Sequence, residues 1–302
     1  MPRIAVSRPD LPHPGPSIEL AYDTFGAASS PPLLLVMGLG AQRILWNDEF
    51  CRMLADAGHY VIRFDNRDAG ESTHLRDARM TDIRTAMLAA FSGGRIEAPY
   101  TLSDMATDTA GLIEALGLGS AHVVGASMGG MIAQTLAIEY PALVRTLTSI
   151  MSSTGDPSLP MATPAALEVL LTAPPFERQA AIEHAVKVFR VIGSPGFPFD
   201  EDFVRAVAAM SYDRGFDPLG VGRQLGAIMA SGNRTARLAS LSVPALVIHG
   251  SDDPLVPVEA AHATARAIPG ARLVVIEAMG HDMPREIWSR LVEEISALTH
   301  AA

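Results

Sequence analysis

Residues 121–130 read AHVVGASMGG, and this stretch decides the fold that we expect for the chain. Its first part, 121–125, is an apolar run typical of a strand buried on both faces of a parallel sheet. Its second part has the pattern G-x-S-x-G, and a helix is predicted directly after it, over 131–140. A serine at such a turn is held clear of the sheet, and the two glycines leave room where chains come close. We therefore interpret Ser127 as a nucleophile; the alternative is a glycine- and serine-rich turn without chemistry.

Strands and helices alternate on both sides of this stretch. Buried strands are predicted at 33–37, 60–64, 121–125 and 144–150, and helices at 48–57, 103–116 and 131–140. Ser103 is the predicted N-cap of the second helix. Such alternation is typical of a mostly parallel α/β sheet with helices on its faces, so residues 1–150 are predicted to be the first part of an α/β core.

The pattern changes between residues 151 and 238. Prolines separate short helical stretches there, and no buried strand is predicted, which indicates a helical cap inserted into the core. Buried strands return at 244–250 and 272–276, so residues 239–302 are predicted to complete the core. For residues 80–99 we favour a long loop near the cap over a short helix at the mouth of the site.

A serine nucleophile needs a histidine base, which an acid orients in turn. In this sheet type the chain order is nucleophile, acid, histidine. His281 follows the last buried strand and lies at the sheet edge where Ser127 emerges, whereas His122 and His249 lie in buried strands and are interpreted as structural. Asp253, after the strand at 244–250, is favoured as the acid. Its neighbour Asp252 suits a turn, although either aspartate could have that role.

An oxyanion needs two backbone donors. We expect the N–H of Met128, the residue after the nucleophile, and the N–H of Leu39 in the glycine turn after the strand at 33–37. Several further residues are candidates to line an apolar substrate pocket, with core packing or turn formation as the alternative for each. They are Gly38, Trp46, Met131 and Met283, together with the side chains of Met128 and Met279.

The composition argues against several classes of partner. The 302 residues carry a formal net charge of −10, so nucleic acid and an anionic membrane surface would be repelled on average. No signal peptide is evident at the N-terminus and no run approaches the ~20 apolar residues that span a bilayer, so we expect a cytoplasmic protein. The single cysteine, Cys51, is interpreted as a packing residue of a helix. No metal or other cofactor is expected, and the oligomeric state is left open.

Together these residues resemble the α/β-hydrolase superfamily over nearly the whole chain, and within it the bacterial branch that contains aclacinomycin methylesterase. The resemblance is carried by residues 34–38 (LLVMG), 46–50 (WNDEF), 61–68 (VIRFDNRD), 122–129 (HVVGASMG) and 279–281 (MGH). It implies a sheet of about eight strands with a helical cap, a Ser127–Asp253–His281 triad, and oxyanion donors at Leu39 and Met128. Met37 and Asp68 stand where the superfamily often has histidine and glycine, and both departures fit this branch.

The resemblance implies a hydrolase that cleaves a small to medium apolar carboxylic ester, including a methyl ester, or a lactone, through an acyl-enzyme. The same triad serves C–C hydrolases, peptidases and perhydrolases, and the fold also occurs in ligand-binding receptors without turnover. Dehalogenases and epoxide hydrolases carry aspartate at the position of Ser127, so these two activities are not expected.

Overall fold

The strands form one eight-stranded sheet in a computed structural model that describes residues 2–6, 17–79, 85, 94 and 96–302. The strand order is β1-β2-β4-β3-β5-β6-β7-β8. The strands are β1 (Arg3–Ala5), β2 (Glu19–Phe25), β3 (Pro32–Val36), β4 (Tyr60–Phe64), β5 (Ala121–Ala126), β6 (Val144–Ile150), β7 (Ala245–Gly250) and β8 (Arg272–Ile276). The expected α/β-hydrolase fold is therefore confirmed.

Two strands at one edge run against the others. Strands β3 to β8 pair in parallel, whereas β1 pairs antiparallel with β2, and β2 pairs antiparallel with β4. The sequence did not predict β1 and β2. β1 has three residues, and β2 carries exposed and half-buried polar residues, so neither presents the continuous apolar run of a central strand.

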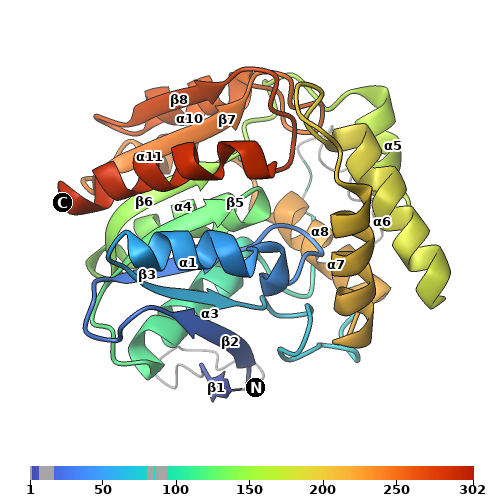
Figure 1. The fold of residues 1–302 in the computed structure, drawn as a ribbon, viewed down its shortest axis with the longest axis horizontal. Helices are drawn as coiled ribbons and strands as arrows, with labels where there is room; N and C mark the ends of the chain where they lie inside the picture. Colours follow the sequence, from blue (N-terminus) through green and yellow to red (C-terminus); the bar gives the residue numbers. More distant parts are fainter. Residues whose placement is uncertain (1, 7–16, 80–84, 86–93, 95) are drawn as a thin grey trace.

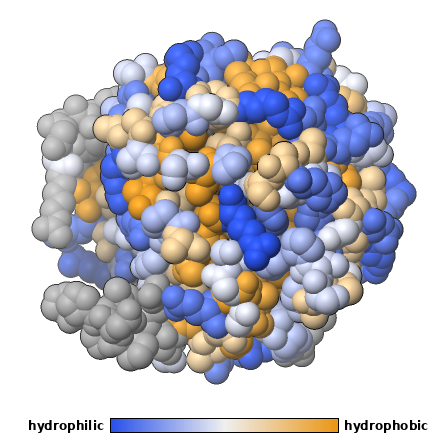
Figure 2. Space-filling view, turned by 90° about the vertical axis from the view of Figure 1, so that its left-hand side faces the viewer, coloured by the Kyte–Doolittle hydropathy of each residue, from blue (hydrophilic) through white to orange (hydrophobic). Residues whose placement is uncertain are grey.

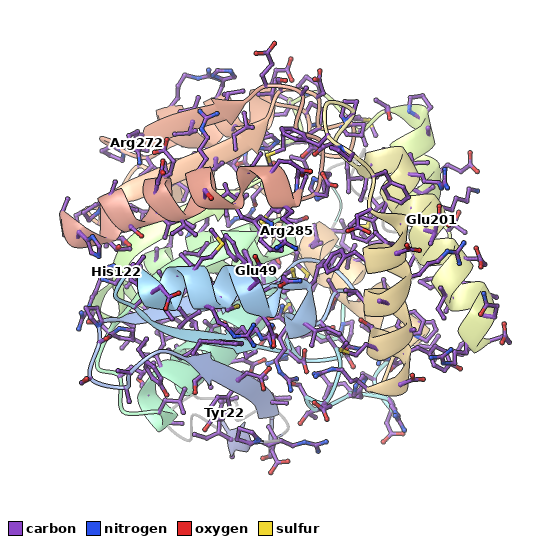
Figure 3. All side chains as sticks on the ribbon, viewed as in Figure 1. Tyr22, Glu49, His122, Glu201, Arg272 and Arg285 are labelled. Atoms are coloured by element: carbon purple, nitrogen blue, oxygen red, sulfur yellow. The ribbon has the colours of Figure 1, made fainter. Side chains whose placement is uncertain are left out.

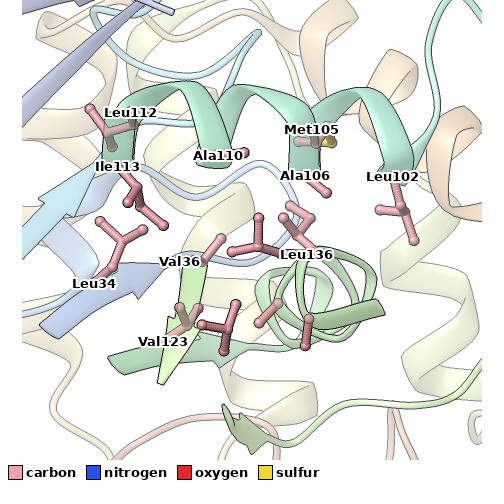
Figure 4. Close-up of a cluster of buried hydrophobic side chains, with 14 of the residues drawn as sticks. Leu34, Val36, Leu102, Met105, Ala106, Ala110, Leu112, Ile113, Val123 and Leu136 are labelled. Atoms are coloured by element: carbon pink, nitrogen blue, oxygen red, sulfur yellow. The ribbon is translucent and has the colours of Figure 1, made fainter. Parts of the chain in front are cut away.

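Helices cover both faces of the sheet (Figure 1). α1 (Asp48–Asp56) and α11 (Trp288–His300) lie on one face, and α3 (Leu102–Ala115), α4 (Met128–Glu139) and α10 (Glu259–Ala267) lie on the other. Along β3, Leu33 and Leu35 pack on the α1 side, while Leu34 and Val36 pack against α3 and α4 (Figure 4). This alternation explains the unbroken apolar run, because both faces of the strand are buried.

The first turn of α3 differs from the prediction. Its N-cap is Thr101, whose hydroxyl accepts from the backbone N–H of Asp104 while the Asp104 carboxylate accepts from the N–H of Thr101. Ser103, the predicted cap, instead donates its hydroxyl to Glu139 on α4. A reciprocal capping box satisfies two free backbone donors, which gives it the advantage over a single cap at Ser103. The prediction for residues 80–99 falls mostly outside the described residues.

Residues 151–238, called the inserted segment below, leave the sheet after β6 and return to it at β7. They contain five helices and no strand, and α5 to α8 gather beyond the carboxyl ends of the parallel strands (Figure 1). The helices are α5 (Pro164–Leu171), α6 (Arg178–Ile192), α7 (Glu201–Asp213), α8 (Pro218–Ser231) and α9 (Thr235–Leu238).

The remaining surface has mixed character. On the side away from α5 to α7, hydrophilic and hydrophobic residues are interspersed (Figure 2). On the face covered by α1 and α11, Arg285 donates to Glu49 at 2.6 Å and ties the turn that precedes α11 to α1 (Figure 3). Within the described part of the chain, no helix is both long and apolar enough to cross a membrane.

Candidate active site

Ser127 occupies the sharp turn between β5 and α4. Its φ of 55° and ψ of −120° are unusual for a residue with a side chain. The flanking glycines have no space for a side chain: a Cβ on Gly125 would lie 2.1 Å from the carbonyl oxygen of Gly129, and a Cβ on Gly129 would lie 2.1 Å from that of Val36. The chain therefore follows this turn only with glycine at both positions.

Three side chains from separate loops meet at this turn. The Nε2 atom of His281 lies 2.9 Å from the Oγ atom of Ser127, and its Nδ1 atom lies 2.7 Å from Oδ2 of Asp253. His281 and Asp253 are both buried. The backbone N–H of His281 donates to the carbonyl of Ile192 at 2.7 Å, so the inserted segment fixes the histidine loop directly.

The surroundings of Asp253 favour its ionised carboxylate form. Its Oδ1 atom accepts from the N–H groups of Leu255 and Val256 at 2.9 and 2.8 Å, and Nε2 of His249 lies 3.4 Å from Oδ2. Burial alone would raise the pKa of this carboxyl, but the charge interaction with His281 and the hydrogen bonds together hold the pKa well below its usual range. The carboxylate can thus orient the histidine and stabilise an imidazolium.

A large cavity opens above Ser127 and His281. Its volume is about 1260 Å³, larger than most small-molecule sites, and its lining is mostly apolar. The aromatic residues of the inserted segment that line it are Phe189, Phe197, Phe199, Phe203, Tyr212 and Phe216. A substrate with a sizeable hydrophobic part therefore fits next to the hydroxyl of Ser127.

The predicted pocket residues divide into two groups. Gly38, Trp46, Met131 and Met283 all line the cavity. Met128 and Met279 are not among the residues that line the cavity, so the prediction that their side chains do so is wrong. Both side chains instead pack in the hydrophobic core, on opposite faces of the sheet. Each follows or precedes a site residue in the chain, but its side chain points into the core.

The glycine turn after β3 lies against Ser127. A Cβ on Gly38 would be 3.1 Å from Cβ of Ser127 and 3.6 Å from its Oγ. Leu39, the next residue, lines the cavity, and Met128 begins α4 directly after Ser127. Backbone donors from these two segments, the second of them a helix N-terminus, are suited to an anionic oxygen formed at Ser127.

Two polar residues around this site were not predicted to belong to it: His249 was interpreted as a structural residue of a buried strand, and Gln224 was not singled out. His249 donates through Nε2 to the carbonyl of Val256 at 2.7 Å and also lies beside Asp253. Gln224 on α8 bonds to the backbone of the glycine turn. The position of His249, four residues before Asp253, was a usable signal, but nothing in the sequence pairs Gln224 with a loop 184 residues away.

One cluster among the described residues has the composition of a metal site. Potential ligand atoms of Asp68, His74 and Asp217 lie within 4.8 Å of one another. The guanidinium of Arg223 bonds to Asp68 and to Asp217 at 2.7 and 2.8 Å. Since a cationic side chain already neutralises both carboxylates, we do not interpret this cluster as a metal site.

The sheet order, the serine turn and the inserted helices define the class of protein. The chain belongs to the α/β-hydrolase family: the family model described as the alpha/beta hydrolase fold matches residues 31–284.

Individual relatives narrow this assignment. Two rhodomycin D methylesterases, DauP of Streptomyces sp. strain C5 and DnrP of Streptomyces peucetius, are 32% and 31% identical to the chain, each over 94% of this chain and 96% of the relative. A thermophilic esterase from Thermogutta terrifontis has a similar solved structure, with a TM-score of 0.72 and 25% identity over 100% of this chain and 99% of that chain. The predicted resemblance to the methylesterase branch is confirmed.

Proposed function

We propose that this protein, a carboxylic ester hydrolase, works through an acyl-enzyme on Ser127, with His281 as the base and Asp253 as the acid that orients it. The observation that carries the proposal is the pair of contacts at 2.9 and 2.7 Å that links the three side chains, of which Ser127 and His281 line the cavity. The inserted segment would act as the cap that covers the substrate, between core parts 1–150 and 239–302.

The reaction has two steps. The Ser127 hydroxyl gives its proton to Nε2 of His281 while Oγ bonds to the ester carbonyl, and the alkoxide leaves with that proton as an alcohol. A water molecule then gives a proton to His281 and attacks the acyl carbon, which releases the acid and restores Ser127. The N–H groups of Leu39 and Met128 stabilise the negative oxygen in each tetrahedral intermediate.

A methyl ester of a bulky ring acid is the substrate class that we favour over a simple short-chain ester. The relatives are named for rhodomycin D, and the cavity of about 1260 Å³ with its aromatic lining suits a large hydrophobic acyl group. Lactones remain the second substrate class, because a ring ester opens by the same two steps.

The test compares wild-type protein with Ser127→Ala. We expect the wild type to hydrolyse p-nitrophenyl esters and methyl esters of ring acids and to react with a fluorophosphonate, and the variant to lose labelling and at least about 10³-fold in kcat. Hydrolysis that survives in the variant would contradict the role of Ser127. Labelling without ester turnover would instead favour the lactone, C–C, peptide or perhydrolysis alternatives, and stable ligand retention without product would favour a receptor.

A further inference from the structure

Gln224 on helix α8 bridges two loops that end at the active site. Its side chain is fully buried. The Oε1 atom accepts from the backbone N–H of Gly40 at 2.8 Å, and the Nε2 atom donates to the carbonyl of Arg67 at 2.8 Å. One amide of the inserted segment therefore joins the turn after β3 to the loop after β4.

The turn that Gln224 holds is the one proposed to supply Leu39 as an oxyanion donor. Gly38 packs against Ser127 on one side, and on the other side Gly40, with a φ of 66°, packs against Val221 of α8. The side chain of Asn66 donates to the carbonyl of Met37 at 2.9 Å, which fixes the beginning of the turn. The bond from Gly40 to Gln224 fixes its end.

Helix α8 is itself held firmly against the core. Arg223, the neighbour of Gln224, forms two hydrogen bonds to Asp68 at 2.8 and 2.7 Å, and both side chains have no exposed surface. The same helix approaches so closely that a Cβ on Gly220 would lie 2.4 Å from the carbonyl oxygen of Asp68. Gln224 is thus presented to the turn by a helix that has little freedom to shift.

We propose that Gln224 is a positioning residue that fixes the turn at 38–40 so that the N–H of Leu39 faces the oxyanion. This inference rests on the proposed function, since it assigns how one of its two donors is held. A preorganised donor stabilises the transition state without reorganising during the reaction, and a donor displaced by a loosened turn loses most of that effect. Val221, Leu225 and Ile228 of α8 line the cavity, whereas Gln224 does not. We therefore expect loss of its hydrogen bonds to change substrate affinity less than it changes kcat.

The first experiment replaces Gln224 by methionine, which has a similar shape and no amide. The matched control is Gln179→Met, at an exposed position on α6. With p-nitrophenyl butyrate, we expect Gln224→Met to lower kcat about 10- to 100-fold with KM changed less than about threefold. The Ki of butylboronic acid, whose adduct with Ser127 mimics the tetrahedral intermediate, rises by a similar factor. The control stays within about twofold of the wild type.

A second variant separates positioning from packing. In Gln224→Glu, a neutral carboxyl can accept from Gly40 and donate to Arg67, whereas the ionised form loses the bond to Arg67. Burial raises the pKa of such a carboxyl, so the ratio of variant to wild-type kcat is expected to fall between about pH 5 and pH 9. This variant carries the test if Gln224→Met does not fold.

Two results would overturn the inference: a kcat for Gln224→Met within twofold of the wild type, or a fall in activity with an unchanged boronate Ki. For Gln224→Glu, a ratio of variant to wild-type kcat that does not change with pH would also overturn the inference. A wild type that turns over no ester is a different outcome, because it removes the proposed function itself.

Discussion

Ser127 has a φ of 55°, a backbone conformation that costs a non-glycine residue about 1–3 kcal/mol. The surrounding backbone holds it there: its N–H donates to Ile150 at 2.9 Å, and its carbonyl accepts from the N–H of Gly130 at 2.9 Å and from the Ser152 hydroxyl at 2.8 Å. Ser127, the proposed nucleophile, is therefore held in place by the fold itself.

The proposed role of Asp253 leads to a prediction on activity. Asp253→Asn keeps the shape of the side chain but removes the charge that stabilises the imidazolium of His281, so kcat is expected to fall about 10³- to 10⁴-fold with little change in KM. The comparison is Asp252→Asn, the adjacent and exposed aspartate, in steady-state assays with the same ester. A greater loss at Asp252 than at Asp253 would reassign the acid.

Single residues of the site were predictable to different degrees. Ser127 lies in a motif whose strand-to-helix context is local, and His281 and Asp253 follow buried strands in the expected chain order. The structure brings these three predicted side chains together because each follows the end of a parallel strand, and its place on that strand determines its place at the sheet. His249 precedes Asp253 by four residues, which is a local signal, whereas Gln224 meets the loop after β4 only in the folded chain.

At the scale of elements, helix α8 and the loop after β4 form a unit around a buried ion pair. Asp68 has a φ of 64°, a conformation that suits the glycine common at this position in the superfamily. Its carboxylate compensates by accepting from Arg223, from the hydroxyl of Tyr100 and from the N–H of Leu75. The presence of Asp68 in place of that glycine is therefore coupled to Arg223, which lies in the inserted segment.

The ion pair between Arg223 and Asp68 predicts that loss of the arginine destabilises the protein and that a second substitution, at Asp68, restores part of the stability. Arg223→Met leaves the Asp68 carboxylate buried without its guanidinium, which is expected to lower the free energy of unfolding by about 3–5 kcal/mol. Adding Asp68→Gly removes the stranded charge and suits the positive φ, so the double variant is expected to recover at least half of the loss. Urea denaturation measures the free energy of unfolding of the single and the double variant. A single variant that loses less than about 1 kcal/mol would refute the coupling.

Elements with continuous apolar runs were predicted well, and those that depend on partners were not. The central strands are apolar on both faces, which is visible in one sequence, whereas the edge strands β1 and β2 depend on pairing with distant residues. The start of α3 shows the same limit, because Ser103 suits a cap locally but is engaged by Glu139.

At the scale of the whole molecule, acid stability depends on a histidine far from the cavity. His122 lies at the side of the molecule away from α5 to α7, and its Nδ1 atom lies 3.0 Å from the hydroxyl of Thr146 (Figure 3). Burial, with the charges of Arg145, His59 and His300 as smaller causes, lowers the pKa of His122 to about 4. The folded state thus favours the neutral imidazole more strongly than the unfolded state does.

Because the pKa of His122 is lower in the folded chain than in the unfolded chain, acid is expected to lower the stability of the fold. The unfolded chain binds the proton near pH 6.5, so the stability that His122 contributes is complete above that pH and is lost as the pH falls toward 4. When the pH is lowered from 7.5 to 4.5, the free energy of unfolding is expected to fall by about 2 kcal/mol more in the wild type than in His122→Asn. Urea denaturation at the two pH values measures this difference. Equal losses in both proteins would contradict the assignment, and ester hydrolysis at pH 7.5 serves as the control for an intact site.

The inserted segment contacts four loops that surround the site. These contacts join the carbonyl of Ile192 to His281, the N–H of Thr163 to the carbonyl of Pro254, the amide of Gln224 to Gly40, and Arg223 to Asp68. During evolution, the cavity-facing positions of α5 to α7 can diverge to accept new acyl groups while these attachment points stay constant. A chimaera that received the inserted segment of a relative would need the matching loop residues from the same donor. The natural unit of exchange in this protein is consequently the inserted segment together with the four loops that it contacts around the site.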